Sequence, residues 1–361
     1  MGIGQGWSER GPACQRLVGV VTLAAVLAGC SAAASPSANG TLAPAVSPAS
    51  TPIATANPDP VPSLAIGSPP EIERAEELAH ENRFEEAIAA FTTIIEASPD
   101  SRAAFEGRGC ARVKADIDVE AGLADLDRAL ELGADGERVH RCRAFALQLL
   151  GDLEGALAEA ERAVELGPDA PQAHATLGNI LDMLGRGEEA LAAYDRAIEL
   201  DPDSVDAAYA YHNRGVARHG ADDETGALAD YNRAIELNPE YAEPYVSRGY
   251  SGLWAGDCVA ALADAEKAIE LKPRLATAYG ARALCRADGG DLDGGWEDAN
   301  TAIELGRTDY FSFYVRGLIA AEKGDRTSAK LDFEKAIDLA ASVEQIARVG
   351  ELAEEYGISL E

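Results

Sequence analysis

Residues 243–273 read EPYVSRGYSGLWAGDCVAALADAEKAIELKP, and this stretch decides the fold of the chain. Its first half predicts a helix with Tyr245 and the small residue Gly249 on one face, because they lie four residues apart. A turn follows at Gly256, and alanines at helical spacing then mark a second helix that ends before Pro273. Small residues on the facing surfaces let two helix backbones approach closely. The stretch therefore predicts one tightly packed helical hairpin.

The same pattern recurs along the chain with a nearly constant period. In each unit, an alanine of the second helix is followed by an aliphatic residue, an acid and leucine. These alanines are Ala129, Ala163, Ala197, Ala234, Ala268, Ala302 and Ala336. Successive members are 34, 34, 37, 34, 34 and 34 residues apart. Such a period predicts a linear array in which each hairpin packs on its neighbours.

An aromatic residue, a small residue four positions later, a turn with glycine, alanines on the second helix and a closing proline together resemble the tetratricopeptide repeat. The resemblance implies an all-α fold, a right-handed α-solenoid of about eight helical hairpins over residues 71–341. The amphipathic final segment, residues 342–361, is expected to be a capping helix over the open end of the array. The resemblance is specific for the fold and not for the function.

The first thirty residues have the features of a bacterial export signal. Arg10 and Arg16 precede thirteen uncharged residues, a run too short to span a bilayer and typical of a signal-peptide core. The run ends in Leu-Ala-Gly followed by Cys30, which resembles the lipobox of bacterial lipoproteins. We therefore expect residues 1–29 to be a signal peptide and Cys30 to carry a lipid anchor on the extracytoplasmic side of a membrane. Residues 30–70, rich in Pro, Ala, Ser and Thr, are expected to be a disordered tether.

The charge of the chain argues against nucleic acid as a partner. The sequence contains 62 acidic and 31 basic residues, a formal net charge of −31, whereas nucleic-acid binding requires a basic surface. The same charge disfavours contact with anionic lipid heads, so membrane attachment should come from the anchor. The oligomeric state does not follow from the sequence.

The histidines do not form a catalytic or metal-binding set. His212 and His219 share a helix face but lie seven residues apart, roughly 10 Å, which is too far for one metal ion. His140 and His174 stand where other units carry an aromatic residue, so we interpret them as packing substitutes. Phosphate-binding loops, metalloprotease helices and nucleophile elbows are not found in the sequence. We expect no metal, no cofactor and no enzymatic activity.

A second line of residues lies beside the packed face of each first helix and is rich in aromatic residues in the later units. It comprises Tyr209, His212, Val216 and His219, then Val246, Tyr250, Leu253 and Trp254, then Phe311, Tyr314 and Leu318. In tetratricopeptide proteins this line faces the concave groove, so the resemblance implies a peptide-binding surface. The candidate partner-binding residues are Tyr209, His212, Tyr250, Trp254, Phe311 and Tyr314. The alternative is that these residues pack between adjacent helices.

Four cysteines remain once Cys14 and Cys30 are set aside. They form two pairs in adjacent units, Cys110 with Cys142 and Cys258 with Cys285, and are possible disulfides in an exported protein. Buried thiols are the alternative.

These expectations describe a membrane-anchored protein–protein interaction scaffold of the bacterial envelope, which binds partner peptides or proteins in its concave groove. The alternative function is a non-catalytic accessory subunit or regulator of a cell-wall or secretion enzyme.

Overall fold

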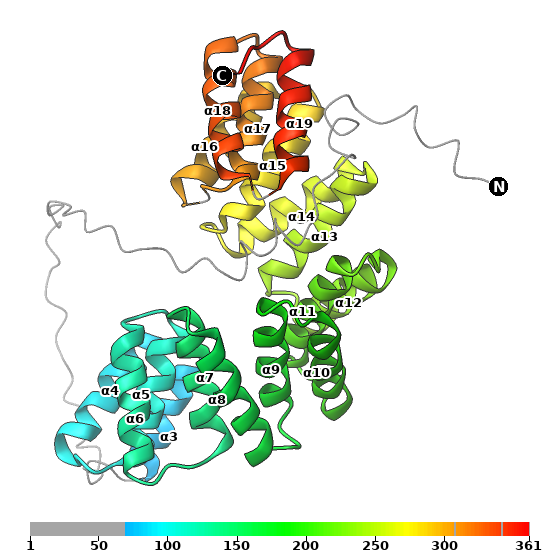
Figure 1. Cartoon of the computed structure of the whole chain (residues 1–361). Coiled ribbons are helices and arrows are strands. Elements are labelled where there is room, and N and C mark those ends of the chain that lie inside the picture. The colour runs from blue at the N-terminus through cyan, green and yellow to red at the C-terminus, as the bar shows by residue number, and fades with distance from the viewer. Residues whose placement is uncertain (1–68, 307, 341, 361) are drawn as a thin grey trace, which may run out of the picture. The chain divides into compact units, whose positions relative to one another are not determined.

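The computed structural model describes residues 69–306, 308–340 and 342–360, and every regular element within these ranges is an α-helix (Figure 1). The helices are α3 (Pro69–His80), α4 (Phe84–Ala97), α5 (Arg102–Lys114), α6 (Val119–Glu131), α7 (Glu137–Leu149), α8 (Leu153–Leu166), α9 (Pro171–Met183), α10 (Gly187–Leu200), α11 (Ala207–Gly220), α12 (Glu224–Leu237), α13 (Ala242–Ala255), α14 (Cys258–Leu271), α15 (Ala276–Asp288), α16 (Leu292–Glu304), α17 (Tyr310–Glu322), α18 (Arg326–Leu339) and α19 (Val343–Glu355). The expectation of an all-α fold is confirmed.

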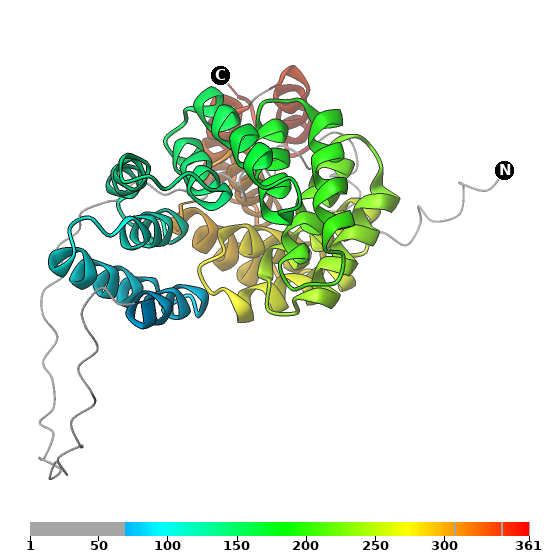
Figure 2. The same cartoon turned by 90° about the horizontal axis from the view of Figure 1, so that it is seen from below.

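The helices pair into hairpins within two compact units, which meet in sequence at Pro168 and Asp169. The first unit contains three hairpins, α3 to α8, and the second contains five hairpins, α9 to α18, followed by α19. In each unit the two helices of a hairpin pack together, and the first helix of one hairpin contacts the first helix of the next. Figure 2 shows this succession of hairpins in chain order. The expected eight hairpins and final helix are therefore present.

A glycine followed by an aspartate forms the turn inside four of the eight hairpins. Gly151, Gly256, Gly290 and Gly324 have positive φ angles between 80° and 87°, which favour glycine. The aspartate that follows each of them caps the second helix, because its side chain accepts a hydrogen bond from the backbone N–H three residues later. The Gly-Asp pair of the sequence thus ends one helix and starts the next.

Small residues of the first helix lie directly beneath rings of the second. A Cβ atom added at Gly178 would lie 2.8 Å from the ring of Tyr194, and one at Gly215 would lie 2.6 Å from the ring of Tyr231. Both rings are at most 1% exposed. The repeated small residue is therefore required by close packing of the hairpin.

An arginine next to this small residue forms a buried ion pair in five hairpins. Its guanidinium donates two hydrogen bonds, of 2.8–2.9 Å and 2.7 Å, to an aspartate of the second helix that is at most 8% exposed. The pairs are Arg108–Asp125, Arg214–Asp230, Arg248–Asp264, Arg282–Asp298 and Arg316–Asp332. Each guanidinium also lies 5.3–5.7 Å from the ring centroid of the aromatic residue three positions earlier.

The same arginines also connect successive hairpins. Nη1 of Arg248 donates to Asn232 and Nη1 of Arg316 donates to Asn300, in both cases on the second helix of the preceding hairpin. The hairpin α9–α10 differs, because Leu177 and Ala193 occupy the positions of the arginine and the aspartate. In α9–α10, two apolar residues thus take the place of the ion pair that five other hairpins contain.

The last helix, α19, covers the end of the second unit. Val349 and Leu352 are buried, and the Tyr356 hydroxyl donates to Glu322 of α17. Val343 and Ile346 remain exposed at the start of α19. The helix therefore caps the array through its second half.

Candidate functional site

The structure buries most of the aromatic second line. Tyr250 of α13 is fully buried, its ring lies edge-on to Phe311 of α17 with centroids 5.7 Å apart, and its hydroxyl donates to the Thr277 carbonyl at 3.1 Å. Tyr314 is 1% exposed and stacks on Tyr310 with centroids 5.7 Å apart. The prediction that Tyr250, Phe311 and Tyr314 are accessible ligand anchors is therefore wrong. Packing between helices, the alternative, explains them.

The reason is the composition of the intervening helix α15. Its second line carries Thr277 and Gly280, which are 34 residues before Phe311 and Tyr314. Small side chains on α15 leave space across which rings of α13 and α17 meet. The rings of α13 and α17 therefore pack against each other over α15, where they were expected to line a concave groove.

His212 is also part of the interior. It is 5% exposed, with Nε2 2.9 Å from the Ser247 hydroxyl and Nδ1 3.1 Å from the Tyr241 hydroxyl. Burial lowers the pKa of His212 to about 4, although the charge of Glu243 acts to raise it. A buried, neutral imidazole bonded on both sides stabilises the fold, so the prediction of His212 as a partner contact is wrong.

Tyr209 and Trp254 differ from the other four candidates. Trp254 is half-buried against the core, and its Nε1 makes no hydrogen bond within the described part of the chain. Tyr209 is 41% exposed, although burial of its phenol raises its pKa. A ring that is both accessible and partly desolvated is suited to contact another molecule. Tyr209 therefore remains a candidate for partner binding.

The exposed ring of Tyr209 lies on α11, next to α9, whose second line is polar. On α9, one repeat step of 37 residues earlier, the second line comprises Gln172, Ala175, Asn179 and Asp182. Asp182 is half-buried, and burial raises the pKa of its carboxyl group. Met183, the next residue, is 37% exposed. These residues were not predicted, because they are polar and the candidates on this line were chosen for their aromatic rings.

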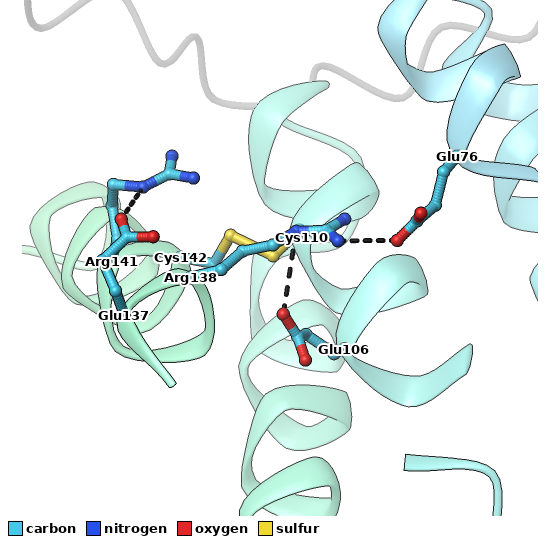
Figure 3. Close-up of a disulfide and its surroundings, with 7 residues drawn as sticks. All are labelled: Glu76, Glu106, Cys110, Glu137, Arg138, Arg141 and Cys142. Atoms are coloured by element: carbon cyan, nitrogen blue, oxygen red, sulfur yellow. Dashed lines mark hydrogen bonds and ion pairs between the residues drawn. A yellow bond between two sulfur atoms is a disulfide. The ribbon is translucent and has the colours of Figure 1, made fainter. Parts of the chain in front are cut away.

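In the first unit the second line is charged. Arg138 and Arg141 of α7 are 71 residues before Tyr209 and His212, in the same register. Arg138 forms ion pairs with Glu76 of α3 (2.6 Å) and with Glu106 of α5 (3.7 Å), and Figure 3 shows both pairs as dashed lines. Burial raises the pKa of Glu106, and the nearby Arg138 opposes this rise. Arg141 is bound to Glu137 at 2.6 Å, so carboxylates of the same unit bind both arginines.

A disulfide joins two first helices beside these ion pairs. Cys110 of α5 and Cys142 of α7 are bonded, with α-carbons 5.4 Å apart, and both are buried (Figure 3). Cys258 and Cys285, the other possible pair, are not in a disulfide. Cys258 begins the second helix α14, whereas Cys285 lies in the first helix α15, so they do not repeat the pairing of two first helices. The possible Cys258–Cys285 bridge is therefore not formed.

His140 takes the place of an aromatic residue but adds polar contacts. It is 8% exposed, with Nδ1 2.7 Å from Glu159 and Nε2 3.2 Å from Asp135. Among the described residues, no group of three or more His, Cys, Asp and Glu side chains could hold a metal ion.

None of the described helices combines the length and the apolar character needed to cross a membrane. Cys30, the predicted signal peptide and nearly all of the predicted tether lie outside the described residues.

Comparisons with known proteins identify the repeat. A family model described as tetratricopeptide repeat matches residues 72–137 and 146–205, and a second model of the same description matches residues 208–241 and 312–342. Together these matches cover more than half of the chain. No curated protein matches the sequence.

Solved structures agree with this fold. The chain is similar to a chain of the APC/C hetero-tetramer Cut9-Hcn1, with a TM-score of 0.67, 12% identity and coverage of 80% of this chain. It spans 55% of the length of that chain. It is also similar to a tetratricopeptide repeat protein from Parabacteroides merdae, with a TM-score of 0.50, 17% identity and coverage of 70% of this chain and 98% of that one. At these identities the likeness concerns the fold alone.

Proposed function

Because this chain belongs to the tetratricopeptide repeat family, we propose that it is a membrane-anchored scaffold of the bacterial envelope that binds partner proteins or peptides without catalysis. Tetratricopeptide repeats generally mediate protein–protein interactions. The observation that carries the proposal is the presence of eight such hairpins, three in the first unit and five in the second, with a second line that stays accessible at Tyr209, 41% exposed. The binding surface proposed here is therefore the second line of α9 and α11.

Two features support a location outside the cytoplasm. The Cys110–Cys142 disulfide is of a kind that persists in oxidising compartments and is rare in the cytosol. The sequence before Cys30 resembles a lipoprotein signal. Both features are explained if the folded array stands on the extracytoplasmic side of a membrane.

A photo-crosslinking amino acid at position 209 is expected to capture a partner protein in the native host, because this position is accessible on the proposed surface. The matched control is the same amino acid at Val259, which is 83% exposed on the second helix α14. With the crosslinking amino acid placed instead at the exposed Met183 of the same surface, Tyr209→Ala should weaken capture about tenfold, the effect of losing one contact ring of 1–2 kcal/mol. Equal capture from positions 209 and 259, or capture from position 259 only, would place the binding surface elsewhere.

The anchor is tested independently of partner binding. Cys30→Ala is expected to abolish incorporation of a labelled fatty acid, since that thiol is the proposed acceptor of the lipid. Cys258→Ala, which changes a cysteine inside the array, should leave labelling unchanged. Undiminished labelling of the Cys30 variant would contradict the proposed anchor.

A further inference from the structure

We propose that the second lines of α9 and α11 dock a basic, extended segment of the partner, with Asp182 receiving a lysine or arginine and Tyr209 receiving an apolar side chain. This inference rests on the proposed function and adds the chemistry of the partner.

Asp182 is half-buried and differs in its partners from the buried aspartates of the second unit. Asp230, Asp264, Asp298 and Asp332 each receive two hydrogen bonds from an arginine. The carboxylate of Asp182 makes no hydrogen bond or ion pair with the part of the chain that the structure describes, and burial is the cause that raises its pKa. A cation supplied by a partner would favour the charged carboxylate and so offset the free-energy cost of its burial.

The second lines of α9 and α11 carry no cationic side chain that could form an ion pair with Asp182. The second lines of α9 and α11 contain neither lysine nor arginine. His212 is buried with its pKa lowered, and His219 is bonded to Glu224. Arg214 and Arg218 of α11 are both bound to Asp230. A positively charged group at Asp182 must therefore come from outside the two helices.

The apolar contact lies on the neighbouring helix, toward the other end of α9. Tyr209 of α11 is in register with Gln172 of α9, ten residues before Asp182, which corresponds to about 15 Å along the helices and, with about 9 Å between helix axes, to about 17 Å in all. An extended chain advances about 3.3 Å per residue, so about five residues span this distance. The partner segment should therefore carry its basic residue about five positions from its apolar one. Met183, exposed beside Asp182, adds an adaptable apolar contact for the stem of the basic side chain.

Charge complementarity favours a partner of this kind and excludes one occupant from within the chain. The net charge of −31 attracts basic segments over a distance. Residues 31–68 of the chain itself contain no lysine or arginine, so they cannot supply the cation. The segment directly before the array is thereby ruled out as the occupant, and the charge of the chain favours a separate, basic polypeptide.

Selection of a random twelve-residue peptide library on the full chain tests the inference. The selected peptides should carry a lysine or arginine about five positions from an aromatic or aliphatic residue. For one such synthetic peptide, Asp182→Asn is expected to raise the Kd about tenfold, as loss of one charged hydrogen bond implies. Glu188→Gln is the matched control, because Glu188 is an exposed acid of the neighbouring helix α10, and it should leave the Kd unchanged. Circular dichroism should show that both variants melt like the parent chain.

Three outcomes would overturn the inference: selected peptides without basic residues, equal affinity of the Asp182→Asn and Glu188→Gln variants, or no selected peptide. The outcomes that would contradict the proposed function differ from these. If a partner is captured from position 209 and Asp182→Asn does not weaken that capture, the scaffold stands and the basic partner is rejected. If capture occurs from position 259 alone, the proposed surface itself is rejected.

Discussion

Replacing Arg316 by leucine is expected to destabilise the second unit by about 3 to 5 kcal/mol, because it leaves the buried carboxylate of Asp332 without its cation. Asp332 is 5% exposed, and its two carboxylate oxygens each accept a hydrogen bond from the guanidinium of Arg316. The substitution also removes the bond to Asn300 of the preceding hairpin. Urea unfolding followed by circular dichroism would measure the loss.

The control for this prediction is provided by the chain itself. In α9–α10 the same two positions are Leu177 and Ala193, and the hairpin packs without an ion pair. The double variant Arg316→Leu with Asp332→Ala should therefore lose no more than about 1 to 2 kcal/mol, because no buried charge is left unpaired. A double variant that is less stable than the single one would show that the ion pair contributes stability which leucine and alanine cannot replace.

The helical array could be predicted because its determinants are local in sequence. The recurring alanines, the turn glycines and the closing prolines each act within one hairpin, so a single unit such as residues 243–273 shows them all. The ring of Tyr231 over Gly215 is an example, since both residues belong to one hairpin. Repetition then places the same pair in other hairpins of the chain.

The accessibility of the second line could not be read from one helix. Whether Tyr250 is open depends on α17, two hairpins later, because Phe311 covers it. The signal was the small side chains of α15 between them, and it appears only when three successive units are aligned. Asp182 was not predicted for a related reason. In the sequence, a carboxylate on a helix cannot be told from a solvated residue. Its half-burial without an ion pair becomes evident only when the structure is compared with the arginine-bound aspartates of other hairpins.

Reduction of the Cys110–Cys142 disulfide is expected to destabilise the first unit by about 3 to 4 kcal/mol, the chain-entropy contribution of a loop of this size. The bond closes a sequence separation of 32 residues and joins α5 to α7. Because each hairpin of a linear array depends mainly on its neighbours, the loss should be confined to α3–α8. Hydrogen exchange of the intact chain with and without reductant would locate it.

The cysteines of the second unit provide the comparison for this experiment. Cys258 and Cys285 are not in a disulfide, so the helices α9 to α18 should exchange at the same rate in both conditions. The variant Cys110→Ala with Cys142→Ala should reproduce the reduced state and respond no further to reductant. Faster exchange in both units would show that the bond stabilises more than its neighbouring hairpins, while unchanged exchange in α5 and α7 would show that packing alone holds them.

Retention of the bond in protein isolated from the host without reductant would support folding in an oxidising compartment, since glutathione and thioredoxin keep cytosolic thiols reduced.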